Sequence, residues 1–191
     1  MKVIGINGSG RKDGNTAILI NKVFDELKKE GIECELIQLA GQTVHGCTAC
    51  YGCYKNKNNQ CVIKDDPINE CIEKMRTADG IILGSPVYVA DVSSEMKALI
   101  DRACLVSRAN DSMFRRKVGA AVTAVRRGGS IHAFDTINHF FTISEIMIAS
   151  SSYWNFALGR EIGDVLKDEE GMLTMKILGE NMAWLLKKIH G

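Results

Sequence analysis

The sequence predicts an α/β domain in which five parallel strands form a sheet that helices cover on both faces. Apolar runs of strand length alternate with amphipathic segments of helical spacing along the chain. The runs at 80–84 and 118–125 are almost continuously apolar, which is typical of parallel strands buried on both faces. With 191 residues, of which 46% are hydrophobic, the chain is long enough to build a sizeable core.

The first elements follow from local signals. The apolar run at 2–6 predicts a strand, and a glycine-rich turn at 8–16 leads into a helix. Gly31 stands where a helix C-terminal cap is expected, and a second strand follows at 35–39. The first helix is indicated by an apolar stripe at helical spacing, formed by Ile20, Val23, Phe24 and Leu27.

The alternation continues to the end of the chain. Pro67 suits the first turn of a helix that ends near Thr77. The last helix carries apolar residues spaced alternately three and four positions apart, from Met175 to Ile189. We interpret this apolar stripe as the face that packs on the sheet. The other expected elements are helices at 93–107, 131–148 and 172–189 and a short fifth strand near 150–153.

These elements form one domain, 1–191, with a cysteine-rich insertion at about 41–66 after the second strand. We expect the strand order 2-1-3-4-5. Sheets of this kind bind ligands beyond the carboxyl ends of their strands, where the strand order reverses. The loops after Ile6, Leu83 and Val125 therefore border the expected site.

Charge and hydropathy exclude several classes of protein. Lys and Arg number 24 against 23 Asp and Glu, so there is no basic excess of the kind that nucleic-acid binding needs. No apolar run approaches the ~18 residues of a membrane span. The chain passes from Met1 and Lys2 straight into a strand-like run, so we expect no signal peptide and a cytoplasmic protein.

The loop at 8–16 has the chemistry of a phosphate site. A helix N-terminus presents free N–H groups and a partial positive charge to anions. A Walker A motif is excluded because no Lys follows Gly14, and a dinucleotide motif because Asp13 replaces its third Gly. A terminal phosphate, such as a mononucleotide carries, remains; the alternative is a tight turn before a capped helix. The candidate ligands are Ser9, Arg11, Asn15 and Thr16.

Two further loops are expected to wall the same crevice. Pro86 stiffens the loop after the third strand, and Tyr88 can offer an aromatic face or a hydroxyl to a planar ligand. Arg127 and Gly128 follow the fourth strand and bring positive charge and close backbone approach. Each loop alone is equally well explained as an ordinary turn.

Four of the seven cysteines fall within a short stretch of the insertion. The spacing C-x2-C-x2-C, with a fourth Cys further on, is typical of a [4Fe–4S] cluster. A structural zinc ion and free thiols are the alternatives, although zinc sites more often pair two separated C-x2-C knuckles. Cys34, Cys71 and Cys104 are interpreted as buried apolar residues. The candidate cluster ligands are Cys47, Cys50, Cys53 and Cys61.

The insertion leaves the carboxyl end of the second strand, which neighbours the first. We therefore expect the cysteines on the same rim as the phosphate loop, or paired with it across a subunit interface. A cluster exchanges single electrons, so it could exchange them with a redox-active ligand bound in the crevice.

The whole chain resembles the flavodoxin-fold NAD(P)H-dependent FMN reductases, and its cysteine spacing resembles their iron–sulfur flavoprotein branch. The motifs that carry the resemblance are Gly-Ser-x-Arg at 8–11 with Gly-Asn-Thr at 14–16, Ser-Pro-Val-Tyr at 85–88 and Lys-Ala-Leu-Ile-Asp-Arg at 97–102. Gly10 stands where many members have Pro, which removes no donor to the phosphate.

The resemblance implies a flavodoxin-like three-layer sandwich, FMN as cofactor and a homodimer or homotetramer. Ser9, Arg11, Asn15 and Thr16 would hold the FMN phosphate. The isoalloxazine would be bordered by Pro86, Val87, Tyr88, Arg127 and Gly128.

Together these patterns predict an FMN-dependent oxidoreductase that passes electrons between NAD(P)H or ferredoxin, FMN, a [4Fe–4S] cluster and an acceptor. No catalytic side chain is assigned, because the cofactor carries the chemistry. Two alternatives stay open: a cluster-free NAD(P)H:FMN or quinone reductase, and a non-enzymatic electron carrier or flavin-bound redox sensor.

Overall fold

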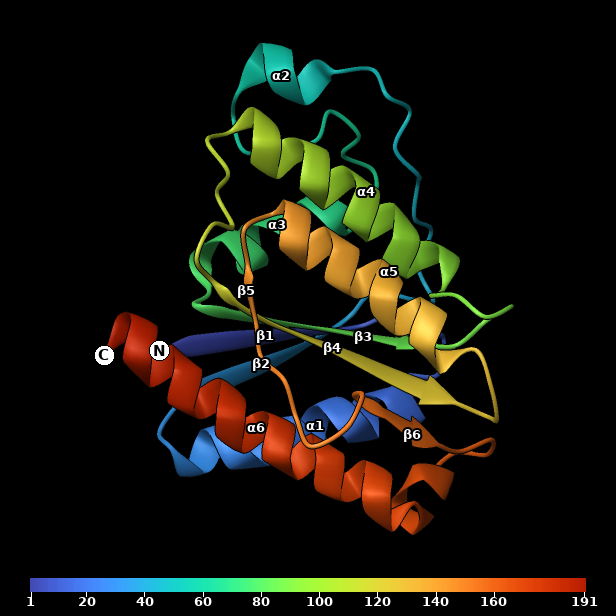
Figure 1. Ribbon diagram of the computed structural model, residues 1–191. Helices are drawn as coiled ribbons and strands as arrows, with labels where there is room; N and C mark the ends of the chain where they lie inside the picture. Colours follow the sequence, from blue (N-terminus) through green and yellow to red (C-terminus); the bar gives the residue numbers. More distant parts are fainter.

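A computed structural model describes residues 1–191, and its centre is a parallel sheet with the order β2-β1-β3-β4-β5 (Figure 1). The predicted strand order is confirmed. The central strands are apolar and almost wholly buried, as the sequence indicates. The strands are β1 (Lys2–Asn7), β2 (Glu33–Gln38), β3 (Gly80–Pro86), β4 (Val118–Val125), β5 (Met147–Ile148) and β6 (Phe156–Leu158).

Helices cover both faces of this sheet (Figure 1). One face packs against α1 and α6, the other against α3, α4 and α5, and each interface has its own apolar core. Neighbouring residues of a strand point to opposite cores, as Val3 and Ile4 do. The helices are α1 (Asn15–Lys29), α2 (Gly52–Asn56), α3 (Ile68–Thr77), α4 (Ser94–Ala109), α5 (Ser130–Ile143), the 3-10 helix η1 (Asp164–Lys167) and α6 (Glu169–His190).

The edge of the sheet beyond β4 differs from the prediction. The strand expected near 150–153 is absent, and the helix expected to reach residue 148 ends at Ile143. The left-handed backbone of Glu145, with φ of 57°, turns the chain out of the helix, and nothing in the sequence signals this. Two short strands instead pair with β4: β5 with its first residues and β6 with its last. The sheet therefore has six strands, and β5 and β6 lie one after the other along the same side of β4.

The predicted insertion after β2 is confirmed. Within 41–66 the only helix is the short α2, which lies beyond α4 as seen from the sheet (Figure 1). No helix is both long and apolar enough to cross a membrane.

Candidate functional site

A cleft lies at the carboxyl ends of β1, β3 and β4, where the strand order reverses. Its volume is about 170 Å³. The loops after β1 and β3 supply most of its walls, as the sequence predicts. The residues expected from the sequence that line the cleft are Ser9, Arg11, Asn15, Thr16, Pro86, Val87 and Tyr88.

Two amide side chains at the strand ends hold the first loop in shape. The Nδ2 of Asn7, which is fully buried, donates to Oε1 of Gln38 at 2.7 Å, and its Oδ1 accepts from the backbone N–H of Ser9 at 3.0 Å. The Nε2 of Gln38 donates to the backbone oxygen of Ser9 at 2.7 Å. The loop is therefore pre-shaped by the sheet and needs no ligand to order it. Neither amide was identified from the sequence.

The N-terminus of α1 presents unused donors to this cleft. Gly14 precedes the helix, no side chain caps it, and no acidic residue lies in the first turn. Thr16 is 1% exposed, and its buried Oγ1 has no hydrogen-bond partner. A buried unpartnered hydroxyl costs about 1–3 kcal/mol. The helix end and the hydroxyl together fit an anion with oxygen acceptors, such as a phosphate.

The loop after β6 closes the other side of the phosphate loop. Asn15 binds it through both ends of its amide: Nδ2 donates to the backbone oxygen of Glu161 at 2.9 Å, and Oδ1 accepts from Gly163 N–H at 2.8 Å. Asn15 therefore joins the two loops as well as lining the cleft. Gly159 permits this contact, because a Cβ there would lie 2.8 Å from the Asn15 Nδ2.

The contribution of this loop was missed because the fifth strand was expected near 150–153. The short apolar run Phe156–Leu158 followed by Gly159 and Arg160 was the signal that could have found it. Nη1 of Arg11 donates to the Arg160 backbone oxygen at 3.2 Å, which ties the two sides together. The lining residues that sequence reasoning missed are Ala124, Arg126, Gly159 and Arg160.

A strained turn follows Tyr88 at the mouth of the cleft. The backbones of Tyr88 and Asp91 exchange hydrogen bonds of 2.8 and 3.0 Å, which leaves Val89 and Ala90 at the turn, both with left-handed backbone. A β-branched residue with φ of 49° is strained, and such strain is often found at functional sites. Asp91 anchors the turn by accepting from Oγ1 of Thr136 at 2.7 Å.

Arg127 and Gly128 do not line the cleft. They lie in the loop between β4 and α5, whose first arginine, Arg126, takes the lining position instead. The next residue, Gly129, has φ of 88° and lies so close to the strained turn that a Cβ would be 2.8 Å from Cα of Ala90. The loop after β3 and the loop after β4 are thus packed together. This close approach, rather than a ligand contact, explains the glycine at position 129.

The four clustered cysteines line one small cavity. Cys47 and Cys50 are exposed, whereas Cys53 is buried and Cys61 is half-buried. The cavity is small, with a volume of about 20 Å³, and apolar side chains from α4 close its inner wall. No three His, Cys, Asp or Glu side chains are arranged to hold a single metal ion. The fold thus brings the four predicted ligands to one small cavity without the spacing of a preformed metal site.

The backbone around this cavity is tightly coiled. Ala49 and Tyr51 are left-handed, with φ of 51° and 55°, between the cysteines of the C-x2-C-x2-C run. Turns that include left-handed residues direct successive N–H groups inwards, and such concavities bind anions and iron–sulfur clusters. The N–H of Gly52 and the hydroxyl of Thr48 lower the pKa of the Cys50 thiol. Burial raises the pKa of Cys53.

Cys61 is brought to the others by contacts that are remote in sequence. Asn69 of α3 accepts from Cys61 N–H at 2.8 Å and donates to its backbone oxygen at 3.0 Å. A Cβ on Gly52 would lie 2.4 Å from Cγ1 of Val62, so only glycine lets the two segments meet this closely. The gap of seven residues before Cys61 is closed by these two contacts.

The other three cysteines lie outside the cavity lining. Burial raises the pKa of Cys71 to about 12 and that of Cys34 to about 11, and it also raises the pKa of Cys104. Thiols of this kind stay protonated and unreactive at neutral pH.

A buried ion pair fastens the cysteine insertion to α4. Arg102 and Asp66 have fully buried side chains, and Nη1 of Arg102 contacts Oδ2 of Asp66. Arg102 also donates to the backbone oxygens of His45 at 3.0 Å and Ile63 at 2.9 Å, on either side of the cysteines. Burial opposes ionisation of Asp66, but Arg102 and the N–H groups of His45 and Ile68 outweigh it, so the pKa of Asp66 is lowered.

The cleft and the cysteine cavity are separated within one chain. The hydrogen bond from Ser93 N–H to Ser85 Oγ, 2.9 Å long, sets the start of α4 beside the end of β3. Arg102 and Val106, which line the cavity, lie about 12 and 18 Å further along that helix. Of the two expected arrangements, a shared rim within one chain is therefore wrong, because the cysteines lie further along α4; pairing across a subunit interface stays a prediction.

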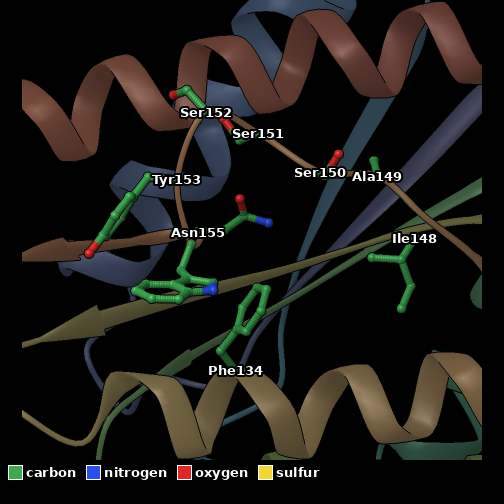
Figure 2. Close-up of a pocket in the computed structure, with 9 residues that line it drawn as sticks. Phe134, Ile148, Ala149, Ser150, Ser151, Ser152, Tyr153 and Asn155 are labelled. Carbon is green, nitrogen blue, oxygen red and sulfur yellow. The ribbon is translucent and has the colours of Figure 1, made fainter.

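A third hollow lies at the interrupted edge of the sheet, where Phe134, Ile148 and Asn155 border a pocket of about 360 Å³ (Figure 2). Figure 2 shows Phe134 reaching from α5 into the space between α5 and α6. Tyr153 and Trp154 are each about half exposed, with ring centroids 4.8 Å apart. None of the predicted cofactor residues lines this pocket, which leaves an apolar edge facing solvent.

Comparisons with known proteins agree with this arrangement. Residues 1–161 match the family of NADPH-dependent FMN reductases. An iron–sulfur flavoprotein of Methanocaldococcus jannaschii is 38% identical over 196 residues, which cover 99% of each chain. One from Methanosarcina thermophila is 33% identical over 193 residues, which cover 100% of this chain and 97% of the relative. A flavodoxin structure from the domain Archaea has the same fold, with a TM-score of 0.64, 15% identity and coverage of 98% and 99% of the two chains.

Proposed function

This chain belongs to the NADPH-dependent FMN reductase family, in its iron–sulfur flavoprotein branch, and we propose that it transfers electrons between bound FMN and a [4Fe–4S] cluster. That it is a flavin oxidoreductase follows from the family. The observation that carries the two-centre proposal is that the chain gathers two separate sets of residues, a cleft with unused phosphate donors and a cavity lined by four cysteines.

The FMN phosphate is proposed to lie at the N-terminus of α1. The hydroxyl of Thr16 supplies the donor that has no partner in the protein, and Ser9 and Arg11 lie beside it. Asn15 holds the two loops that surround the phosphate. Positive charge from the helix end and from Arg11 would neutralise the phosphate and fix its position.

The flavin ring is proposed to lie against the loop after β3. Pro86, Val87 and Tyr88 form this wall, and Tyr88, about half exposed, has an aromatic face to offer. Arg126 brings a positive charge to the cleft and replaces Arg127 and Gly128, which do not line it, as the contribution of the loop after β4. Bound FMN would supply exchange of electron pairs and of single electrons, and the positive charge of Arg126 would stabilise negative charge on the ring.

Cys47, Cys50, Cys53 and Cys61 are proposed to hold the cluster. A C-x2-C-x2-C run with a fourth Cys further on is typical of a [4Fe–4S] cluster, whereas zinc sites more often pair two separated C-x2-C knuckles. The inward N–H groups favour anionic sulfur, and the lowered pKa of Cys50 favours the thiolate that binds iron.

We propose that the protein acts as a homodimer or homotetramer. The two centres lie far apart along α4 in one chain, so a second copy is needed to bring a cluster close to a flavin. The half-exposed Tyr153 and Trp154 at the sheet edge provide an apolar surface for subunit contact. NAD(P)H, ferredoxin and quinones are the proposed donors and acceptors.

The test is a combined flavin, iron and sulfide assay on protein purified without oxygen. We expect one FMN and four iron per chain. Cys50→Ser should lose the iron and keep FMN, whereas the matched control Cys34→Ser should keep both. Stoichiometric zinc, or iron-free protein whose flavin is rapidly reduced by NADPH, would refute the cluster and leave the cluster-free reductase. Slow reduction by nicotinamides with fast exchange with ferredoxin would instead identify an electron carrier.

A further inference from the structure

Arg102 is a buried cation with one donor left over. Its side chain has no exposure to solvent, and its Nη1 and Nη2 atoms are bound to Asp66, His45 and Ile63. Its Nε–H, however, has no hydrogen-bond partner. The guanidinium is planar and is held at both terminal nitrogens, so it cannot rotate to satisfy Nε elsewhere.

No atom of the polypeptide accepts this Nε–H. Arg102 lines the cavity formed by the four cysteines. The other inner-wall residues there, Leu105 and Val106, are apolar and carry no side-chain acceptor. An acceptor in this cavity would meet a donor that is already oriented and carries a positive charge, which favours an anion with several acceptor atoms.

We infer that Arg102 donates its Nε–H to a sulfur of the proposed cluster and raises the cluster's reduction potential. This inference rests on the proposed function. Four thiolates around a [4Fe–4S] core make an anion, and reduction adds a further negative charge. A hydrogen bond to sulfur and a nearby buried cation both stabilise the reduced form, and these are recognised determinants of cluster potential.

The role is separate from the ion pair with Asp66. That pair and the two backbone contacts fasten the insertion to α4 and fix the guanidinium plane. The free Nε–H is the part of the side chain that no structural contact explains. Lysine at position 102 would keep the positive charge, and its ammonium could reach Asp66. It could not, however, donate to Asp66 and into the cysteine cavity at the same time from one planar group.

The test compares the reduction potential of the cluster in wild-type protein and in Arg102→Lys, measured anaerobically by redox titration followed by electron paramagnetic resonance. Iron and sulfide are counted first in the wild type. If the wild type has no cluster, the proposed function fails, and this inference fails with it. If the wild type has a cluster, the titration tests Arg102 alone.

We expect Arg102→Lys to keep four iron per chain. The equilibrium constant for cluster reduction should fall at least tenfold, which corresponds to a reduction potential lower by 59 mV for a one-electron couple. The control Arg108→Lys, an exposed residue on the same helix, should match the wild type, and the flavin potential should be the same in all three proteins. An unchanged cluster potential in Arg102→Lys would overturn the inference.

A second measurement needs no variant and covers the case in which Arg102→Lys fails to fold or to load iron. Wild-type holoprotein is labelled with ¹⁵Nε-arginine, and pulsed electron paramagnetic resonance is recorded on the reduced cluster. Arg102 is the only arginine that lines the cavity, so a ¹⁵N coupling would identify its contact. Absence of any ¹⁵N coupling would refute the hydrogen bond.

Discussion

The buried pair between Arg102 and Asp66 allows a sharp test of how the insertion is held. Asp66→Asn removes the negative charge with little change of shape and leaves the guanidinium buried without its counter-ion. Both side chains are 0% exposed. Breaking such a pair from one side costs about 3–5 kcal/mol, because the remaining charge stays desolvated. Since whole domains are stable by only ~5–15 kcal/mol, this is a large fraction of the total.

The assay is urea unfolding of the cofactor-free protein under reductant, with the free energy of unfolding obtained by linear extrapolation. Asp101→Asn is the matched control: it removes an exposed pair with Lys97 on the same helix, where the side chains are 43% and 49% exposed. That change should cost at most ~0.5 kcal/mol. The double substitution Asp66→Leu with Arg102→Met should recover only part of the loss, because it removes both buried charges but leaves the backbone groups of His45, Ile63 and Ile68 without these partners.

The reasoning is refuted if Asp66→Asn costs less than about 1 kcal/mol, or no more than the control. Either result would mean that water reaches the guanidinium and that the pair does not fasten the insertion to α4.

The other predictions concern the cleft, the thiols and acid stability. Thr16→Val should weaken FMN binding about 10–100-fold in a flavin titration, because it removes a hydrogen bond to a charged group. It should not destabilise the cofactor-free protein in urea unfolding. Gly159→Ala should lower both FMN affinity and stability, by about 1–3 kcal/mol in stability, because its Cβ would lie 2.8 Å from two nitrogen atoms. In cofactor-free protein, iodoacetamide should modify Cys50 at pH 8 while Cys71, with a pKa of about 12, stays unmodified by mass spectrometry. The pKa of Asp66 is lower in the folded protein than its unfolded value of ~3.9. The ionised Asp66 should therefore stabilise the fold fully above pH ~3.9, and this contribution should be lost as the pH falls through the pKa of the folded state. Asp66→Asn should not show this acid-dependent loss of stability.

Contrary outcomes are equally specific. If Thr16→Val binds FMN normally, the phosphate lies elsewhere. If Gly159→Ala is as stable as wild type, the loop after β6 is not packed on Asn15 as described. Modification of Cys71 as fast as Cys50 would contradict its burial, and equal acid sensitivity of wild type and Asp66→Asn would remove Asp66 from the account of acid unfolding.

The sequence predicted the layers because alternating strands and helices depend on short-range patterns, and the strand order followed from the flavodoxin-like sheet that was expected. Apolar runs such as 80–84 mark strands by themselves. The interrupted sheet edge was not predictable in this way, because it depends on the left-handed turn at Glu145 and on pairing with both ends of β4. Arg160 in the cleft was missed for the same reason.

For the sites, the sequence by itself determined which chemical groups are present: four thiols in a compact spacing, and hydroxyl, amide and guanidinium groups at a helix N-terminus. Only the tertiary structure decided their neighbours. Asn69 holds Cys61, Gln38 shapes the loop at Ser9, and Arg102 reaches the cysteine cavity with a free Nε–H. The physical reason is that a hydrogen bond or a buried charge depends on distance and desolvation, and these are set by packing between segments far apart in the chain.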